Sequence, residues 1–431
     1  MSIIGGRYRH GLRPLVPRST DERGRVATPL ELLFDLTFVA SFGVAGNELA
    51  HGIAVGHALT ATTAFVFAMF SIVWAWISVS WFASAFDNDD WLHRVLTLVQ
   101  MAGVIVLAIG LPPQFASIDG GTVLDNRTLV AGYVVIRVAL LLQWVRVARG
   151  DPRLLPLARR YMLLVGSAQL GWVLVAMLPL TTWPALAIAV VLFSLEALVP
   201  ALTERSGART TAGATPWHPH HLAERFALLA IIALGETVFG TLASASEIST
   251  EQGWSFDAVV VVGAGIALSF ALWWTYFLVP HAAALAARRG RMLPGGYLHI
   301  VLFGAIAASG AGLHVVGYAY DPHFEVESTT VVASIAIPVA IFMAVRYVLQ
   351  AWLVSALPRD GVLQWVATAL PLGAIALSAA STPIWACLLV VLVSPVSVIM
   401  WFEVAGWRSL DAQLARVDPL AAIIPPGRTP T

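Results

Sequence analysis

The chain has 431 residues, of which 58% are hydrophobic and only 12% are charged. A soluble domain usually carries about 25% charged residues, so this composition excludes an ordinary soluble protein. The 25 basic residues balance the 25 acidic ones, so the net charge gives no indication of a nucleic-acid partner.

Apolar segments long enough to cross a bilayer as helices, which takes about 20 residues, recur along the whole chain. They lie at residues 29–49, 58–83, 92–112, 128–148, 155–179, 183–203, 222–243, 257–280, 297–317, 329–350, 362–380 and 384–407. Lipid tolerates only helices or closed barrels, and these segments are too long for barrel strands. The sequence therefore predicts an all-α polytopic membrane protein with about 12 transmembrane helices.

The segment before the first span is polar and rich in arginine, and it has no short apolar run before a small-residue cleavage site. This pattern argues against a cleaved signal peptide. If this segment is cytoplasmic, the inner loops receive nearly all the arginines, whereas the outer loops hold only Arg127 and are acidic, as at Glu247 and Glu325. The excess of arginine on one side predicts a protein of the cell membrane with both termini in the cytoplasm.

An ordered series of polar landmarks occurs twice. The two copies match Glu31 with Glu224, a tryptophan-rich stretch at 74–81 with one at 273–276, His93 with His299, and Glu196 with Glu403. Polar residues are rare in this chain, so their ordered recurrence indicates an internal repeat. Each copy holds an even number of spans, which gives both copies the same orientation about an axis along the membrane normal.

The predicted organisation has five parts. An arginine-rich cytoplasmic segment covers residues 1–28, the first six-helix repeat covers 29–203, a cytoplasmic linker covers 204–221, the second six-helix repeat covers 222–407, and a cytoplasmic tail covers 408–431. The two repeats are expected to superpose by a rotation of about 180° about the membrane normal.

Four titratable residues start predicted spans near the cytoplasmic boundary: Glu31, His93, Glu224 and His299. A carboxylate beside a histidine near a membrane interface can share a proton. The Thr28–Glu31 stretch also has the pattern of a helix capping box, which gives Glu31 a structural alternative. Glu224 lacks the Ser or Thr partner that this alternative needs.

Two carboxylates lie inside predicted spans. Asp35 follows Glu31 by one helical turn on the same face, and Glu236 lies about 18 Å beyond Glu224 along the helix axis. A charge at that depth costs about 2.5–3.5 kcal/mol, so such a residue usually faces a cavity or a partner. Arg137, near the middle of the fourth span, is the candidate basic partner, and the sequence leaves open which acid it meets. An ion pair that only fixes helix register is the alternative.

Each predicted repeat supplies two tryptophans that are predicted to line the interior. They are Trp76 and Trp81 in the first repeat and Trp273 and Trp274 in the second. The acidic stretch Asp87–Asp90 is interpreted as a solvated turn or as the cation-attracting mouth of a channel. His221 and Glu224 have the spacing of metal ligands on a helix, but the histidines here lie in a proline-rich linker and have no counterpart before Glu31. No metal site and no cofactor are predicted.

These landmarks resemble the bacterial low temperature requirement A family of integral membrane proteins. The matching stretches are Pro29–Leu36, Phe86–Asp90 with the tryptophans before it, His221–Phe226 with Leu234–Glu236, and Tyr297–His299. The resemblance spans nearly the whole chain and implies a multi-pass membrane protein whose family name derives from a cold-growth phenotype. The family's second aromatic cluster tends to be followed by acidic residues, whereas Trp274–His281 contains none.

The favoured functional hypothesis is a secondary transporter of a small solute that is coupled to protons through intramembrane carboxylates. A cation channel built from two six-helix repeats is one alternative, and a membrane-embedded lipid-modifying enzyme is another. The expected partners are the lipid bilayer and a small solute or ion, without nucleic acid, and a homodimer is left open.

The predicted topology can be tested with reporter fusions. A reporter fused after Arg416 is expected to report a cytoplasmic location, and one inserted near Glu325 an extracytoplasmic one, because arginine-rich segments stay on the cytoplasmic side. The reverse pattern of reporter activity contradicts the predicted orientation.

Overall fold

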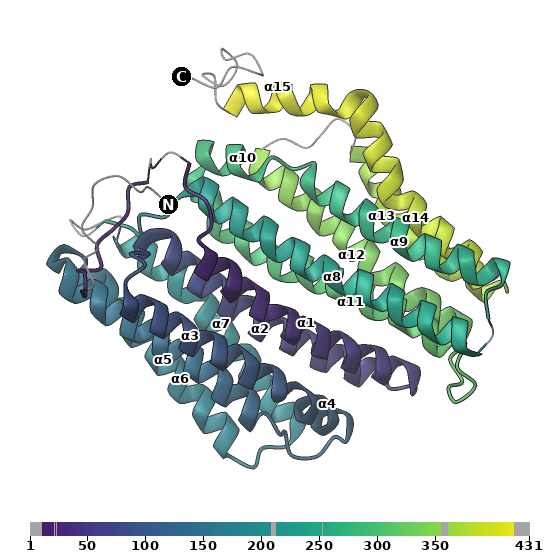
Figure 1. Cartoon of the computed structure of the whole chain (residues 1–431), viewed down its shortest axis with the longest axis horizontal. Helices are drawn as coiled ribbons and strands as arrows, with labels where there is room; N and C mark the ends of the chain where they lie inside the picture. Colours follow the sequence, from purple (N-terminus) through teal and green to yellow (C-terminus); the bar gives the residue numbers. More distant parts are fainter. Residues whose placement is uncertain are drawn as a thin grey trace. The chain divides into compact units, whose positions relative to one another are not determined.

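Residues 11–20, 22, 24–207, 213–251, 253–354 and 361–417 are described by the computed structural model shown in Figure 1. Within these residues the chain folds into helices, with one isolated β-bridge between Val123 and Thr181. Parts of the predicted N-terminal segment, linker and tail, at residues 1–10, 208–212 and 418–431, lie outside the described residues.

The helices follow one another with short connections. The first half of the chain forms α1 (Pro29–Ala54), α2 (Ala58–Phe86), α3 (Trp91–Ile109), α4 (Leu111–Asp119), α5 (Arg127–Gly150), α6 (Leu155–Met177) and α7 (Thr182–Gly207). The second half forms α8 (Pro219–Glu251), α9 (Phe256–Phe277), α10 (His281–Ala287), α11 (Met292–Tyr318), α12 (Ser328–Val354), α13 (Gly361–Ala379), α14 (Ile384–Trp401), a π-helical turn (Phe402–Gly406) and α15 (Trp407–Val417).

In the described part of the chain, 12 helical segments are long and apolar enough to cross a membrane. This confirms the prediction of an all-α protein with twelve candidate spans. One predicted span, at 92–112, extends as the two consecutive helices α3 and α4, which meet at Gly110. Pro112 and Pro113 stand in the first turn of α4. Backbone N–H groups in a first turn have no acceptor within the helix, so proline, which has no N–H, is tolerated there.

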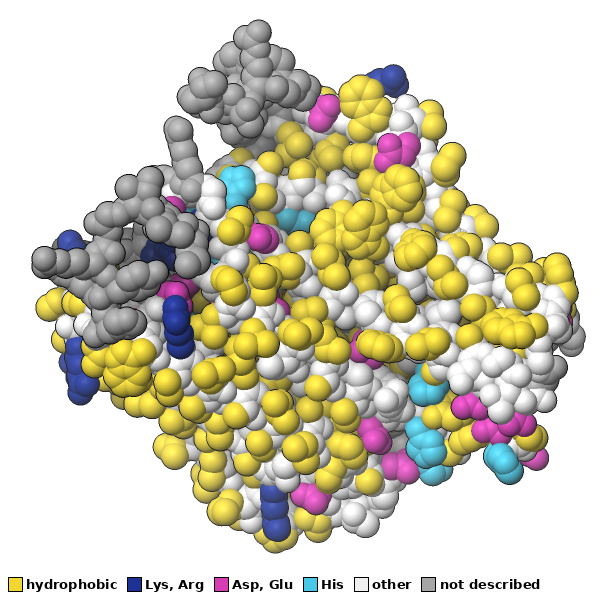
Figure 2. Space-filling model, viewed as in Figure 1, with side chains coloured by type: hydrophobic (Ala, Val, Ile, Leu, Met, Phe, Trp, Pro, Cys, Tyr) yellow, Lys and Arg dark blue, Asp and Glu magenta, His cyan; other side chains and the backbone are white. Residues whose placement is uncertain are grey.

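Large apolar side chains cover much of the outer surface, and Figure 2 shows them spread over the visible face with few charged side chains among them. Leu163 and Leu170 of α6 are 69% and 68% exposed, and Val362 of α13 is 80% exposed. Exposed apolar surface on this scale indicates a surface that contacts lipid rather than water.

The described residues form two compact units. Unit 1 comprises Met1–Thr37, Ala75–Gly110 and Gly121–His218, and unit 2 comprises Phe38–Trp74, Leu111–Gly120 and Pro219–Thr431. The division passes through α1 and α2, whereas the predicted repeats divide the chain at the linker. The repeats and the rotation that relates them stay a prediction.

Neighbours in unit 1 follow chain order, because α3 packs on α5, α5 on α6, and α6 on α7. In unit 2, α11, α12, α13 and α14 pack in the corresponding order. There α9 contacts both α14 and α8, and α8 contacts α11, so these six helices close into a ring.

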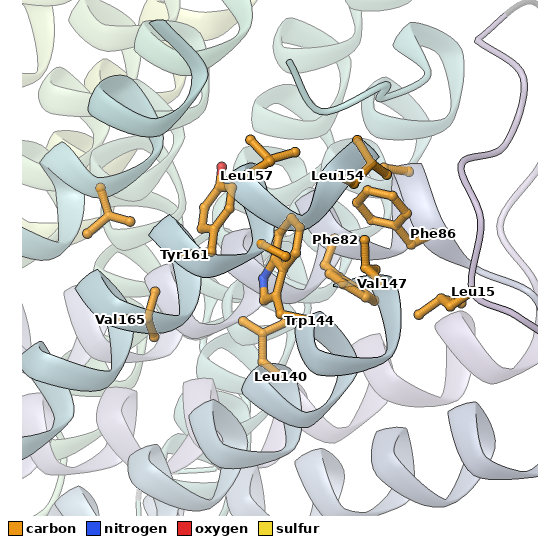
Figure 3. Packing of buried hydrophobic residues seen from close by; sticks show 13 residues of the cluster. Leu15, Phe82, Phe86, Leu140, Trp144, Val147, Leu154, Leu157, Tyr161 and Val165 are labelled. Atoms are coloured by element: carbon orange, nitrogen blue, oxygen red, sulfur yellow. The ribbon is translucent and has the colours of Figure 1, made fainter. Parts of the chain in front are cut away.

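An aromatic core lies within unit 1, and Figure 3 shows it at close range. The rings of Trp144 and Tyr161 stack with centroids 4.3 Å apart, while Phe82 and Phe86 meet Trp144 edge-on. Leu15, from the segment before α1, is buried in the same core. Such aromatic pairs add about 0.5–1.5 kcal/mol each beyond the burial of their area, so this core ties the N-terminal segment to α2, α5 and α6.

Glycines allow α3 and α5 to approach closely within unit 1. A Cβ atom added at Gly132 would lie 2.3 Å from the backbone nitrogen of Leu107 and 2.5 Å from the carbonyl oxygen of Gly103. Small residues permit such close packing of membrane helices, for which van der Waals contact is a main driving force.

This crossing predicts that Gly132→Ala lowers the free energy of unfolding by about 1–3 kcal/mol, because the added methyl group overpacks two backbones. Gly166→Ala in α6 is the control, since its Cβ would meet only Leu141, at 3.9 Å. Thermal unfolding of the purified variants in detergent measures the difference. Equal melting temperatures for Gly132→Ala and the wild type contradict the close crossing.

Candidate functional site

The first turn of α1 forms the capping box that its sequence pattern suggests. The backbone N–H of Thr28 donates to Glu31 Oε2 at 2.8 Å, and the N–H of Glu31 donates to the Thr28 hydroxyl oxygen at 3.3 Å. These reciprocal bonds satisfy two backbone donors at the helix start. Glu31 therefore has a structural task in this structure, and a role in proton transfer stays a prediction.

Asp35 lies one turn further along α1 and is 1% exposed. The indole N–H of Trp76 in α2 donates to its Oδ1 at 2.6 Å. A buried carboxylate with a short charge-assisted bond is held firmly in place. Trp76 thus binds Asp35 within unit 1, and the predicted cavity-lining role of Trp76 is not tested by this contact.

The other three tryptophans lie in different surroundings. Trp81 is buried in unit 1, with its ring 5.7 Å from that of Trp217. Trp273 and Trp274 of α9 are both 46% exposed, on the outer surface of unit 2. Half-exposed tryptophans at span ends are typical of the aromatic belts at a membrane interface.

The acidic turn between α2 and α3 is bound to basic groups of unit 1. Arg94 donates two hydrogen bonds of 2.8 Å to Asp89, and these bonds hold the pKa of that carboxyl below its usual value. Burial acts against ionisation of Asp90, but hydrogen bonds from the backbone of His93 and Arg13 and from Arg146 outweigh it and lower the Asp90 pKa.

Asp87, like Asp90, is buried. Burial raises its pKa, although His93 acts in the opposite direction with its Nε2 3.4 Å from Asp87 Oδ1. Arg18 lies 3.7 Å away, and the nearby charge of Glu31 disfavours ionisation of Asp87 further. The sequence singles out His93 as a proton candidate, and the structure adds Asp87 as the acid beside it.

Arg137 meets Glu196, which answers the question that the sequence leaves open. Arg137 Nη2 lies 2.9 Å from Glu196 Oε2, and both side chains are almost fully buried in unit 1. Tyr133 donates to the same oxygen at 2.6 Å, while Gln169 and Trp172 each donate to Oε1 at 2.9 Å. Four donors from α5 and α6 therefore surround one carboxylate of α7, which fits a structural ion pair that fixes helix packing.

Sequence reasoning missed the neutral members of this network. Tyr133 precedes Arg137 by four residues and Gln169 precedes Trp172 by three, so each pair shares one helix face. Polar or aromatic residues three or four positions apart inside an apolar span are therefore the sequence signal that could have identified these members of the network.

Glu236 lies near the middle of α8 in unit 2 and is 6% exposed. Its Oε1 has no hydrogen-bond partner among the described residues. The carboxylate faces two glycines of α1, since a Cβ at Gly43 would lie 3.7 Å from Oε1 and one at Gly46 would lie 3.3 Å from Oε2. On another side, the backbone of Glu236 packs closely against Gly310 of α11.

His299 is buried in α11 of unit 2. Its Nδ1 lies 2.7 Å from the carbonyl oxygen of Gly295, and its Nε2 lies 3.3 Å from the Tyr276 hydroxyl. The Phe226 ring lies 4.5 Å from its imidazole, and that of His281 lies 5.6 Å away. Glu224, its predicted companion, is half-buried near the start of α8.

A model of the bacterial low temperature requirement A proteins matches residues 26–395, which is most of the chain. The chain belongs to this family. It is also similar to an uncharacterized protein of Rhizobium meliloti (strain 1021), with 27% identity over 259 residues. That match covers 57% of this chain and 57% of the relative, so the chain spans little more than half the length of the relative it matches.

Across the described ranges of this family member, no group of three or more His, Cys, Asp or Glu side chains is placed to hold a metal ion. His221 and Glu224 both lie at the start of α8.

The network around Glu196 predicts a non-additive response to mutation. Glu196→Leu strands the Arg137 guanidinium in an apolar environment and is expected to cost about 3–5 kcal/mol of stability, as is Arg137→Leu, which strands the carboxylate. The double variant removes both charges and is expected to recover part of this loss. Melting temperatures and abundance of the three variants measure the coupling. Strictly additive losses are incompatible with a direct pair.

Proposed function

We propose that the protein is a secondary transporter that couples the movement of a small solute to protons, and that Glu236 carries the proton. The proposal places it in the cell membrane with both termini in the cytoplasm. The observation that carries it is a buried carboxylate near the middle of α8 with one oxygen lacking a hydrogen-bond partner among the described residues.

The energetic argument concerns the charged form of Glu236. A carboxylate at the centre of a membrane costs about 2.5–3.5 kcal/mol on insertion scales, and a hydrogen-bond acceptor without a partner adds about 1–3 kcal/mol. Binding a proton removes the charge and makes the group a donor. A residue that gains from protonation while buried, and releases the proton when water reaches it, has the property that a proton carrier needs.

Glu196 provides an internal contrast. Both glutamates are buried in candidate spans, but Glu196 accepts hydrogen bonds from Tyr133, Gln169, Trp172 and Arg137. That carboxylate is stabilised as an anion and suits a fixed structural role. Within the described part of the chain, Oε1 of Glu236 has no donor at all, which supports a role in which the charge of Glu236 changes.

Two glycines of α1 lie against the carboxylate of Glu236. A Cβ at Gly46 would lie only 3.3 Å from Oε2, so the absence of side chains at Gly43 and Gly46 makes room for the carboxylate at this position. On the other side, the backbone of Glu236 is in close contact with Gly310. This packing supports proton loading at one defined position.

The acidic turn at Asp87–Asp90 gives little support to the cation-channel alternative. Asp89 is paired with Arg94, and Asp90 accepts hydrogen bonds from Arg146. Carboxylates already matched by guanidinium groups attract free cations weakly.

The test uses full-length protein in proteoliposomes that enclose a pH-sensitive dye. Small anions, amines and amino acids are added one at a time, and a solute-evoked change of internal pH identifies a transported class. Glu236→Gln keeps the side-chain shape but cannot bind the proton, so it is expected to insert normally and lose the pH change. Glu251→Gln, an exposed carboxylate at the end of the same helix, is the control and retains it.

An infrared measurement does not depend on finding the solute. Titration of the wild type is expected to show the carbonyl stretch of a protonated carboxyl group that is missing from Glu236→Gln and present in Glu251→Gln. Full proton coupling by Glu236→Gln at normal abundance refutes the proposal. So does a wild-type spectrum identical to that of Glu236→Gln across the titration.

A further inference from the structure

Three arginines lie close together in the connection between α10 and α11 of unit 2. They are Arg288, Arg289 and Arg291, and the excess of arginine on one side predicts a cytoplasmic location for them. Arg288 and Arg291 are partly exposed. Trp352, near the end of α12, lies beside Arg291 and is 40% exposed. Arg288, Arg291 and Trp352 are called the arginine–tryptophan site below.

The guanidinium group of Arg291 is held against Trp352. Its Nη1 donates to the carbonyl oxygen of Trp352, and the indole N–H of Trp352 donates to the carbonyl oxygen of Arg291 at 3.2 Å. The guanidinium carbon lies 5.1 Å from the centre of the indole ring, which is the geometry of a cation–π contact. The bond to the Trp352 carbonyl uses only one of the five N–H donors of the guanidinium group. Arg291 is therefore positioned in advance and keeps donors for a ligand.

The charge of this site is not balanced by an acid. Arg288 lies close enough for its positive charge to act on Arg291, and neither arginine forms an ion pair within the described part of the chain. The Nη1 atom of Arg288 also has no hydrogen-bond partner among the described residues. By contrast, Arg153 in unit 1 is paired with Asp151. Two neighbouring positive charges repel each other, so an anion that contacts both relieves the repulsion.

An apolar stripe on α12 leads to this site. Ile337, Ile341, Val348 and Trp352 are 46%, 41%, 45% and 40% exposed. Their spacings of four and seven residues place them on one face of the helix. The stripe follows the candidate span and ends at Trp352, beside Arg291. An acyl chain that lies along this stripe therefore brings its headgroup to the arginines.

We propose that the arginine–tryptophan site binds an anionic phospholipid, with its phosphate group on Arg291 and Arg288 and an acyl chain along the apolar stripe of α12. The planar fork of a guanidinium group matches the oxygens of a phosphate. Tryptophan is typical of the depth at which headgroups lie, and basic residues at the cytoplasmic face attract anionic lipids. The apolar stripe favours a lipid over a free phosphate ion, because a free ion gains nothing from it.

The experiment measures the melting temperature of full-length, delipidated protein in detergent. Phosphatidylglycerol is titrated in one arm, phosphatidylcholine with the same acyl chains in a second, and inorganic phosphate at constant ionic strength in a third. The wild type is expected to be stabilised by phosphatidylglycerol in a saturable way, and far less by the other two. Phosphatidylcholine lacks the net negative charge, and inorganic phosphate lacks the acyl chain.

Arg291→Gln is expected to weaken the apparent affinity for phosphatidylglycerol by about tenfold or more, because it removes a charge-assisted contact with the phosphate. Arg288→Gln is expected to weaken it as well, and it covers the case in which Arg291→Gln does not fold. Arg153→Gln is the matched control, because it removes one positive charge from unit 1, outside the arginine–tryptophan site, and is expected to leave the affinity unchanged.

The proposal is overturned if phosphatidylcholine or inorganic phosphate stabilises the wild type as much as phosphatidylglycerol does. It is also overturned if the folded arginine variants of the site bind phosphatidylglycerol like the wild type. An equal loss of affinity in Arg153→Gln overturns it too, because that result assigns the effect to net charge rather than to this site.

Discussion

The cost of placing charge inside a membrane is the constraint on which this structure depends. A bilayer offers no water, so every buried ionised group needs a partner, a neutral form or a route to the surface. Unit 1 meets this demand with pairs: Arg137 with Glu196, and Trp76 with Asp35. Arginines also neutralise the acidic turn that precedes α3. The clearest case is the pair of Arg94 with Asp89. Trp76 and Asp35 join α2 to α1, Arg137 and Glu196 join α5 to α7, and Arg146 joins α5 to Asp90 before α3, so the contacts that compensate charge also hold helices together.

Unit 2 treats its buried charges differently. Glu236 has an oxygen without a hydrogen-bond partner among the described residues, and Arg346 donates to two neutral glutamines. A buried carboxylate oxygen without a donor is not the most stable arrangement for a fold, because an apolar residue at that position avoids the desolvation cost. This makes Glu236 the candidate for a function in which its charge changes.

The helical spans and the capping box at Glu31 could be predicted from the sequence, because both depend on residues close together in the chain. An apolar run of sufficient length forms a helix in lipid whatever it packs against, and Thr28 meets Glu31 across three residues. The partner of Arg137 could not be predicted, since Glu196 reaches it only through the packing of α7 against α6 and of α6 against α5. For the same reason, the sequence did not identify Trp76 as a donor to Asp35.

The sequence pairs Glu196 with Glu403 as equivalent landmarks, and the structure gives the two glutamates opposite surroundings. Glu196 is buried beside an arginine, whereas Glu403 stands exposed in the π-helical turn. A π-helical turn holds an extra residue, which changes the direction in which the side chains around it point. In unit 2 the glutamate is therefore directed outward, and the buried Arg346 faces glutamines. The shared place in the sequence pattern therefore does not bring a shared contact, because Glu196 meets Arg137 whereas Arg346 donates to two glutamines.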